Sequence, residues 1–154
     1  MSQANGNFTP KPADVLSWSK RMVGVPFLHD GRDEDGIDCW GLFLHFAQSF
    51  GVGVGDYCYQ DGSCEEHAAL FAENYHRHMR DIGRAEAEPG DIILFRNSIH
   101  GVNHIAIFLG KDKFIHCTRG GGVAINRLAK SALGRRIESF CRLRIDQQNK
   151  ATSQ

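Results

Sequence analysis

The stretch Gly36-Ile37-Asp38-Cys39-Trp40-Gly41-Leu42 decides the fold, because it places a cysteine where a helix is expected to begin. Asp38 has the short acceptor side chain that is preferred at a helix N-cap, so Cys39 is predicted to open the first turn. Unpaired N–H groups and the helix dipole at that position favour negative charge, which lowers the pKa of a thiol. The helix itself is indicated by apolar residues at helical spacing: Leu42, Phe43, Phe46, Ala47 and Phe50.

A cysteine nucleophile also needs an imidazole that holds it as a thiolate and then protonates the leaving amine. His104 begins a nearly all-apolar strand pattern, which runs to Leu109. His116 lies in the next predicted strand, after the turn Gly110-Lys111-Asp112. In a hairpin without bulges, a three-residue loop places both histidines on one face, and a two-residue loop separates them. We therefore predict His104 as the base and His116 as the residue that orients it.

Composition limits the classes of partner. The 154 residues suit one domain with a proper core, and the formal net charge of zero does not favour binding to nucleic acid or to a membrane surface. No apolar run approaches the roughly 18 residues of a membrane span. The segment up to Pro12 has no secretory signal pattern, so we expect synthesis in the cytoplasm without a signal peptide. Five cysteines without CxxC spacing indicate free thiols, although pairing of Cys58 with Cys64 stays open.

The order of periodic segments predicts an α+β fold, with helices first and an antiparallel sheet second. We expect helices over residues 13–23, from Cys39 onward, and over 63–82, where a capping-box pattern precedes an apolar stripe. Residues 1–12 are expected to be a flexible N-terminus, 13–145 a single domain, and 146–154 a frayed tail. Strands are predicted over residues 91–96, 104–109, 113–118, 123–125 and 138–145.

With these residues assembled, the chain resembles the NlpC-type, papain-like cell-wall cysteine peptidases. Members of that family have Asp-Cys at a helix start, Gly-Asp before a strand, a catalytic histidine on the next strand and a second polar residue twelve positions later. The chain matches this order with Asp38-Cys39, Gly90-Asp91, His104 and His116. The resemblance is closest to bacteriophage tail-tip peptidases and their gene-transfer-agent relatives. It rests there on Gly24-Val25-Pro26-Phe27, Pro89-Gly90-Asp91-Ile92-Ile93-Leu94-Phe95-Arg96 and Gly120-Gly121-Gly122-Val123.

The resemblance implies hydrolysis of an amide in the peptide stems of peptidoglycan, typically the γ-D-glutamyl bond to a diamino acid. It implies neither a metal nor an organic cofactor, and it admits phage tail proteins as partners and the virion as a location. Two positions depart from the family. Many members have Tyr where Phe27 stands, so a hydroxyl donor near the oxyanion is missing, which can cost about 10²-fold in rate. Many also have Ser where this chain has Trp40.

Further residues are weaker candidates for contact with substrate: Phe27, Arg32, Asp38 and Trp40. Trp40 fits either a stacking wall for substrate or an ordinary core position. The acids between Asp30 and Asp38 either form a solvated surface loop or hold the free amine of a diamino acid.

Two other readings of the site remain open. One is a structural or wall-binding protein that keeps the fold without cutting, which the absent Tyr hydroxyl at Phe27 favours. The other is a zinc site with Cys39, His104 and His116 as ligands.

Overall fold

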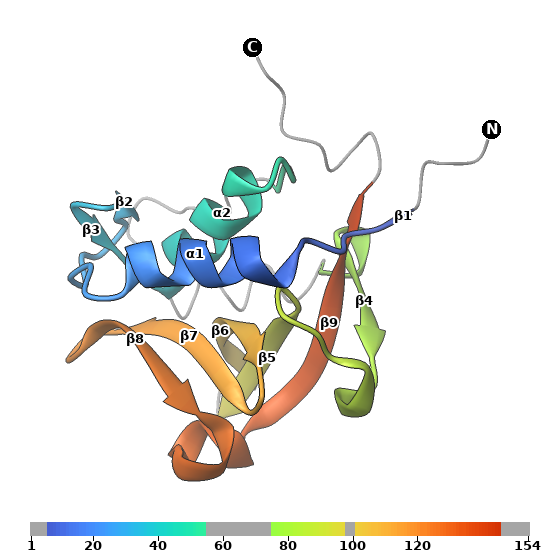
Figure 1. Cartoon of the computed structure of the whole chain (residues 1–154). Coiled ribbons are helices and arrows are strands. Elements are labelled where there is room, and N and C mark those ends of the chain that lie inside the picture. The colour runs from blue at the N-terminus through green and yellow to red at the C-terminus, as the bar shows by residue number, and fades with distance from the viewer. Residues whose placement is uncertain (1–5, 55–74, 98–100, 146–154) are drawn as a thin grey trace.

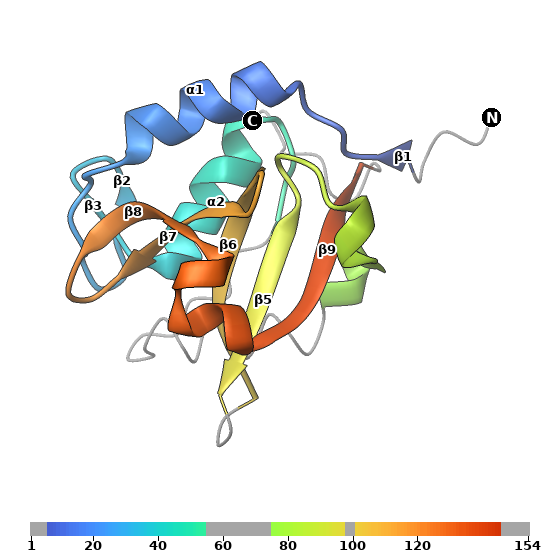
Figure 2. The ribbon, with the colours of Figure 1, turned by 60° about the horizontal axis from the view of Figure 1, so that its bottom comes forward.

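The protein is described here from a computed structural model, which places residues 6–54, 75–97 and 101–145. Within these ranges, two α-helices lie on one face of a twisted antiparallel sheet (Figures 1 and 2). They are α1 (Pro12–Met22) and α2 (Cys39–Ser49). This arrangement confirms the predicted α+β class. No helix in the described ranges combines the length and apolar character that a membrane span requires.

The main sheet has seven strands in the described part of the chain, in the order β1-β9-β5-β6-β7-β8, with β4 also paired to β9. Its central strands are β5 and β6, so the strand that carries His104 lies inside the sheet. The bounds are β1 (Gly6–Asn7), β4 (Met79–Ile82), β5 (Ile92–Asn97), β6 (Gly101–Gly110), β7 (Lys113–Thr118), β8 (Gly122–Arg127) and β9 (Ile137–Ile145).

Short elements complete the described fold. A two-stranded hairpin of β2 (Arg32–Asp33) and β3 (Gly36–Ile37) precedes α2. The 3₁₀ turns are η2 (Tyr75–Arg77), η3 (Arg84–Glu86), η4 (Leu128–Lys130) and η5 (Ala132–Arg135).

The core is divided by the sheet into two apolar clusters. The larger lies between the helices and the sheet and includes Trp18, Phe43, Phe46 and Ile107. The smaller lies against the other side, where Leu128 of η4 joins Phe95, Phe114 and Phe140. Alternate residues of each strand therefore enter different clusters, which explains why β5 and β6 are apolar at nearly every position.

Buried Asp91 and partly buried Arg142 form an ion pair that joins the start of β5 to β9. The guanidinium donates to both carboxylate oxygens, with Nε–Oδ1 and Nη2–Oδ2 distances of 2.9 and 2.8 Å. The Asp91 side chain also accepts the Glu88 backbone N–H at 2.8 Å. This pairing gives the Gly90-Asp91 motif a structural role, and the hydrogen bonds with Asp91 hold the pKa of Arg142 above its ordinary value.

The predicted helix over 63–82 is wrong at its C-terminal end. Residues 55–74 lie outside the described ranges, but Met79–Ile82 is strand β4, which pairs with β9 from Met79↔Leu143 to Ile82↔Phe140. The apolar residues Tyr75, Met79 and Ile82 match helical spacing by coincidence, and pairing with β9 overrides that local pattern.

The N-terminal boundary also differs from the prediction. β1 pairs with the end of β9, and Phe8 is buried and donates its N–H to the Leu143 carbonyl at 2.9 Å. Residues 6–12 therefore belong to the fold instead of to a flexible terminus. The predicted frayed tail, 146–154, lies outside the described residues.

Candidate active site

Asp38 and Cys39 lie as predicted at the start of α2. Asp38 is the N-cap, and its Oδ1 accepts the Gly41 N–H at 2.7 Å. Its other oxygen accepts the Asp30 N–H at 3.0 Å, and Arg32 Nη1 donates to Oδ1 at 3.2 Å. The Asp38 side chain is fully buried, so it fixes the loop to the helix and has no surface for substrate. Arg32 likewise serves this cap, and it also donates to the Gly31 carbonyl.

The first turn of α2 is pressed against the preceding loop. A Cβ atom added to Gly41 would overlap the Gly31 carbonyl oxygen, so only glycine fits there. This contact accounts for Gly41 in the Asp-Cys-Trp-Gly motif, which sequence periodicity alone did not explain. The adjacent Trp40 is fully buried and its ring lies against Phe43, as expected of a core aromatic and not of a wall exposed to substrate.

His104 and His116 meet on neighbouring strands. His104 Nε2 lies 2.9 Å from His116 Nδ1, and the two rings meet edge to face. The shared face is confirmed, but the predicted three-residue loop is wrong. The loop is Lys111-Asp112, both with positive φ, and Gly110 pairs with Lys113. A bulge at Leu109 adds the residue that a two-residue loop lacks, so the histidines still face the same way.

A second irregularity lies beside His104. The β5–β6 register changes from Phe95↔His104 to Arg96↔Val102, so Asn103 is an extra residue in β6. Bulges re-aim neighbouring side chains and increase local twist. The ring of His104 is half-buried next to that of Phe95, with 5.7 Å between their centroids.

Asn126 on β8 is a further polar neighbour that the sequence did not predict. Its Oδ1 lies 2.7 Å from His116 Nε2, so His116 has a partner at each ring nitrogen. Burial lowers the pKa of His116 below its ordinary value of 6.5, and this effect outweighs the opposing contribution of the Asn126 hydrogen bond. His116 is therefore neutral at neutral pH. Only the β7–β8 register, which pairs Phe114 with Asn126, reveals this contact.

The two halves of the candidate site come from packed elements. Helix α2, which begins with Cys39, packs against β6 and β7, the strands of His104 and His116. Cys39 is only 1% exposed. A thiol at a helix start, an imidazole and a second imidazole that orients the first are the parts of a thiolate-based acyl-transfer site.

Phe27 connects this site to the edge of the sheet. It forms a bridge with Ile37, two residues before Cys39, and Arg119 lies over its ring at 5.3 Å from the centroid. The preceding Val25 accepts the Val123 N–H at 2.9 Å, which ties the segment to β8. Phe27 is half-buried next to the loop of Cys39, and it has no hydroxyl to offer there.

The zinc reading is not favoured by the arrangement of donors. In the described residues, one group of three His, Cys or acidic side chains has donor atoms within 4.8 Å of one another, namely His29, Asp30 and Asp38. Cys39, His104 and His116 do not form such a group. Each ring nitrogen of His116 already has a hydrogen-bond partner, and each Asp38 oxygen already accepts a backbone N–H, Oδ1 from Gly41 and Oδ2 from Asp30.

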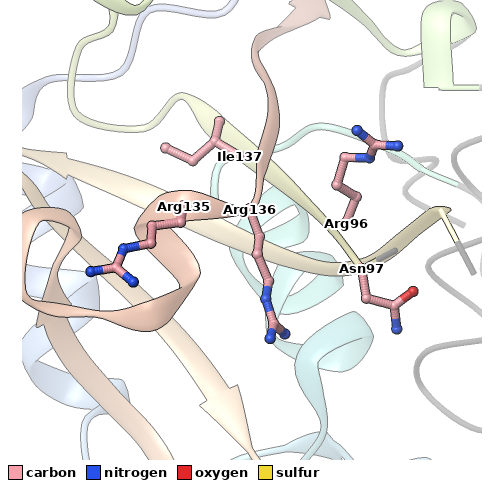
Figure 3. A pocket seen from close by; sticks show the side chains of 5 residues that line it. All are labelled: Arg96, Asn97, Arg135, Arg136 and Ile137. Atoms are coloured by element: carbon pink, nitrogen blue, oxygen red, sulfur yellow. The ribbon is translucent and has the colours of Figure 1, made fainter. Parts of the chain in front are cut away.

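A basic cavity of about 440 Å³ lies at the end of the sheet where β5 stops and β9 begins. Arg96, Arg135 and Arg136 line it together with Asn97 and Ile137 (Figure 3). Arg96 is paired with Glu138 at 3.2 Å. The guanidinium groups of Arg96 and Arg135 point in different directions in Figure 3, so the three cations do not converge on one anion site.

The chain spans about half of the length, or less, of the curated relatives that it matches. A probable endopeptidase NlpC homolog of Haemophilus influenzae is 30% identical over 117 residues, which are 74% of this chain and 53% of the relative. Murein DD-endopeptidase MepS/murein LD-carboxypeptidase of Escherichia coli is 26% identical over 106 residues, or 68% of this chain and 48% of the relative. A γ-D-glutamyl-L-lysine dipeptidyl-peptidase of Bacillus cereus is 23% identical over 72% of this chain and 30% of its own length.

A solved structure with the same fold is an NlpC/P60 family protein of Bacillus cereus. It superposes with a TM-score of 0.67 at 20% identity, covering 86% of this chain and 40% of the other. The pattern of the NlpC/P60 family itself matches residues 24–142, which include Phe27, Cys39, both histidines and Asn126. The chain is thus a member of the NlpC/P60 family.

Proposed function

We propose that this protein is a cysteine peptidase that hydrolyses amide bonds in the peptide stems of bacterial peptidoglycan. The observation that carries the proposal is the pairing of His104 with His116 on strands that pack against α2, whose capped first residue is Cys39. The names of the Haemophilus and Escherichia relatives, an endopeptidase and a murein endopeptidase, support the substrate class.

The proposed mechanism assigns one role to each residue. His104 accepts the proton of the Cys39 thiol, and the thiolate attacks the amide carbon. His104 then donates that proton to the departing amine, which leaves an acyl-enzyme thioester for hydrolysis by water that His104 deprotonates. In this mechanism the Cys39 backbone N–H at the helix start donates to the tetrahedral oxyanion. His116 keeps the imidazole of His104 in position through their hydrogen bond.

We propose the γ-D-glutamyl bond to the diamino acid as the bond that is cut. The family resemblance supports this choice, as does the Bacillus relative, whose name states γ-D-glutamyl-L-lysine. Exposed acids in the β2–β3 hairpin, among them Asp33 and Asp35, offer charge for the free amine of a diamino acid. The Escherichia relative is named for other bonds, so product identity is the deciding observation.

The test is digestion of purified sacculi and of defined stem peptides, with products identified by mass spectrometry. We expect the wild type to release fragments that end at D-glutamate and fragments that begin with the diamino acid, and Cys39→Ala to release neither. Cys117→Ala serves as the matched control, because Cys117 is also buried but its thiol donates to the Ile37 carbonyl. Equal digestion by wild type and Cys39→Ala would overturn the proposal. Products cut at a DD or LD bond would overturn only the choice of bond.

A second candidate function is binding to cell wall without cleavage. Two points favour it: Phe27 lacks the Tyr hydroxyl that the family resemblance implies at this position, and Cys39 is almost fully buried, whereas reactive cysteines are commonly accessible. Co-sedimentation of the protein with sacculi that remain chemically intact would support this candidate over the peptidase.

We also propose that the protein is associated with a phage tail, and that it is made in the cytoplasm and carried in the virion. The resemblance of Gly24-Val25-Pro26-Phe27 and Gly120-Gly121-Gly122-Val123 to tail-tip peptidases supports this setting. Mass spectrometry of particles purified after prophage induction tests it. Peptides of this chain that co-purify with tail proteins would support the setting, and their absence from intact particles would contradict it.

A further inference from the structure

The two histidines form part of a longer hydrogen-bonded chain that ends at Asn126. From β6 to β8 its members are His104, His116 and Asn126, joined at 2.9 and 2.7 Å. His116 is the middle member and only 5% exposed, whereas Asn126 lies at the exposed end of the chain. Asn126 is diagonal to His116 across the β7–β8 ladder, because His116 pairs with Ala124.

The donors and acceptors in these two hydrogen bonds fix which ring nitrogens carry a proton. A carboxamide oxygen only accepts, so its contact with His116 Nε2 requires a proton on that nitrogen. A neutral imidazole carries one proton, which leaves His116 Nδ1 as an acceptor. The partner of Nδ1 is His104 Nε2, and that nitrogen must then be the donor. The remaining nitrogen of His104, Nδ1, is left with a lone pair.

We propose that Asn126 is a positioning residue that sets both imidazoles in the Nε2–H tautomer and thereby leaves His104 Nδ1 as the base for Cys39. This inference rests on the proposed function for its catalytic meaning, but the tautomers themselves are properties of the unliganded protein. When His104 takes the thiol proton on Nδ1, its Nε2–H still points at the lone pair of His116, which stabilises the imidazolium.

The opposite orientation of the Asn126 amide would reverse the direction of donation in both hydrogen bonds. If the Asn126 NH₂ group faced His116, His116 would carry its proton on Nδ1, and His104 would accept it at Nε2. His104 would then hold its own proton on Nδ1 and could not accept another there while neutral. The orientation of the Asn126 amide on β8 therefore decides whether His104 can act as a base toward Cys39.

The experiment is long-range ¹H–¹⁵N NMR of the full chain labelled at histidine, near pH 7.5, with His104→Gln and His116→Gln used for assignment. We expect the Nε2–H tautomer at His116 in the wild type, and the same tautomer at His104 in Cys39→Ala, where no thiol proton can move to His104 Nδ1. Asn126→Leu removes the acceptor and should give mixed or Nδ1–H signals at His116. Asn126→Asp keeps an acceptor and should retain the Nε2–H tautomer. Arg127→Gln, a change at the next exposed residue of β8, is the matched control and should leave both signals unchanged.

Hydrolysis of stem peptides provides the second readout. We expect kcat to fall about tenfold to a hundredfold in Asn126→Leu, as for groups that orient an active imidazole, with a displaced pH profile and a smaller change in KM. Asn126→Asp should recover most of the rate.

The two readouts separate this inference from the proposed function. An Nδ1–H tautomer at His116 in the wild type, or tautomers that do not change in Asn126→Leu, would overturn the inference even if peptides are hydrolysed. Tautomers that depend on Asn126 in a protein that hydrolyses nothing would support the proton arrangement and overturn the peptidase.

Discussion

Asp38 joins three parts of the chain through one carboxylate. Its two oxygens accept the Gly41 N–H of α2, the Asp30 N–H of the loop and a guanidinium N–H of Arg32. Sequence reasoning predicted the cap, because Asp before an apolar helical pattern is a local signal. It did not predict the contacts with Asp30 and Arg32, which depend on how the β2–β3 hairpin folds back. The placement of Cys39 therefore depends on contacts beyond the helix itself.

Asp38→Ala should lower the free energy of unfolding by about 2–4 kcal/mol, because it removes a helix cap and leaves buried N–H groups unsatisfied. Asp38→Asn keeps an acceptor for Gly41 and should cost less. Urea denaturation monitored by circular dichroism measures both. A loss below about 1 kcal/mol in Asp38→Ala would contradict the structural role of this carboxylate.

At the same scale, the candidate site was predictable only in part. Cys39, His104 and His116 stood out because their types and spacing carry chemistry, and the structure places the histidines in contact. Asn126 has no such signal, since an asparagine in a polar strand is ordinary and its partner is ten residues away on another strand. Their catalytic roles remain predictions.

At the scale of elements, the β6–β7 hairpin shows how a correct outcome arose from a wrong detail. The predicted three-residue loop follows from a hairpin without bulges, and the sequence carries no clear signal for the bulge at Leu109. The structure uses a two-residue turn with φ values of 52° at Lys111 and 70° at Asp112. That combination is typical of a type I′ turn, whose twist suits a hairpin.

Lys111→Gly should raise the free energy of unfolding by about 0.5–1 kcal/mol, because glycine adopts positive φ without the strain that a side chain imposes. Lys113→Gly is the matched control and should lower it, since Lys113 lies in strand β7. Thermal and urea denaturation of both variants provide the measurement. Equal destabilisation by the two changes would contradict the turn assignment.

Strand β4 marks the limit of periodicity as a guide to elements. Its two apolar residues, Met79 and Ile82, have helical spacing and do not alternate as in a strand, so only the pairing with β9 makes this segment a strand. By contrast, β5, β6, β7 and β9 were predicted from long apolar or alternating runs, for which one period is clearly favoured.

At the scale of the whole molecule, burial of histidines makes stability depend on pH. Desolvation lowers the pKa of His45 and of His116 below 6.5. His45 Nδ1 accepts the Trp18 indole N–H at 3.0 Å, a bond that a protonated ring cannot accept at that nitrogen. Below about pH 6.5 these two histidines therefore bind more protons in the unfolded state than in the folded state.

We expect the free energy of unfolding to be highest above pH 6.5 and to decrease as the pH falls through that value. Urea denaturation at pH 7.5 and at pH 5 tests this expectation in the wild type and in His45→Asn with His116→Asn. The double variant should lose less stability between the two pH values. His76→Asn, a change at an exposed histidine, is the control. A wild type that is equally stable at both pH values would contradict the burial argument.

The proposed function requires Cys39 and His104 to form a thiolate–imidazolium pair. The rate of alkylation of each cysteine by iodoacetamide, resolved by peptide mass spectrometry from pH 5 to 9, tests it most directly. Cys141 is an internal reference, because burial raises the pKa of its thiol to about 12 and it should not react in this range. His76→Ala is the control for loss of a histidine.

We predict that Cys39 in the wild type and in His76→Ala reacts rapidly near pH 6, and that His104→Ala abolishes this reactivity. A Cys39 rate that follows an ordinary thiol, with a pKa of about 8.5, in both the wild type and His104→Ala would contradict the proposed pair. Binding to cell wall without cleavage would then be the better-supported function.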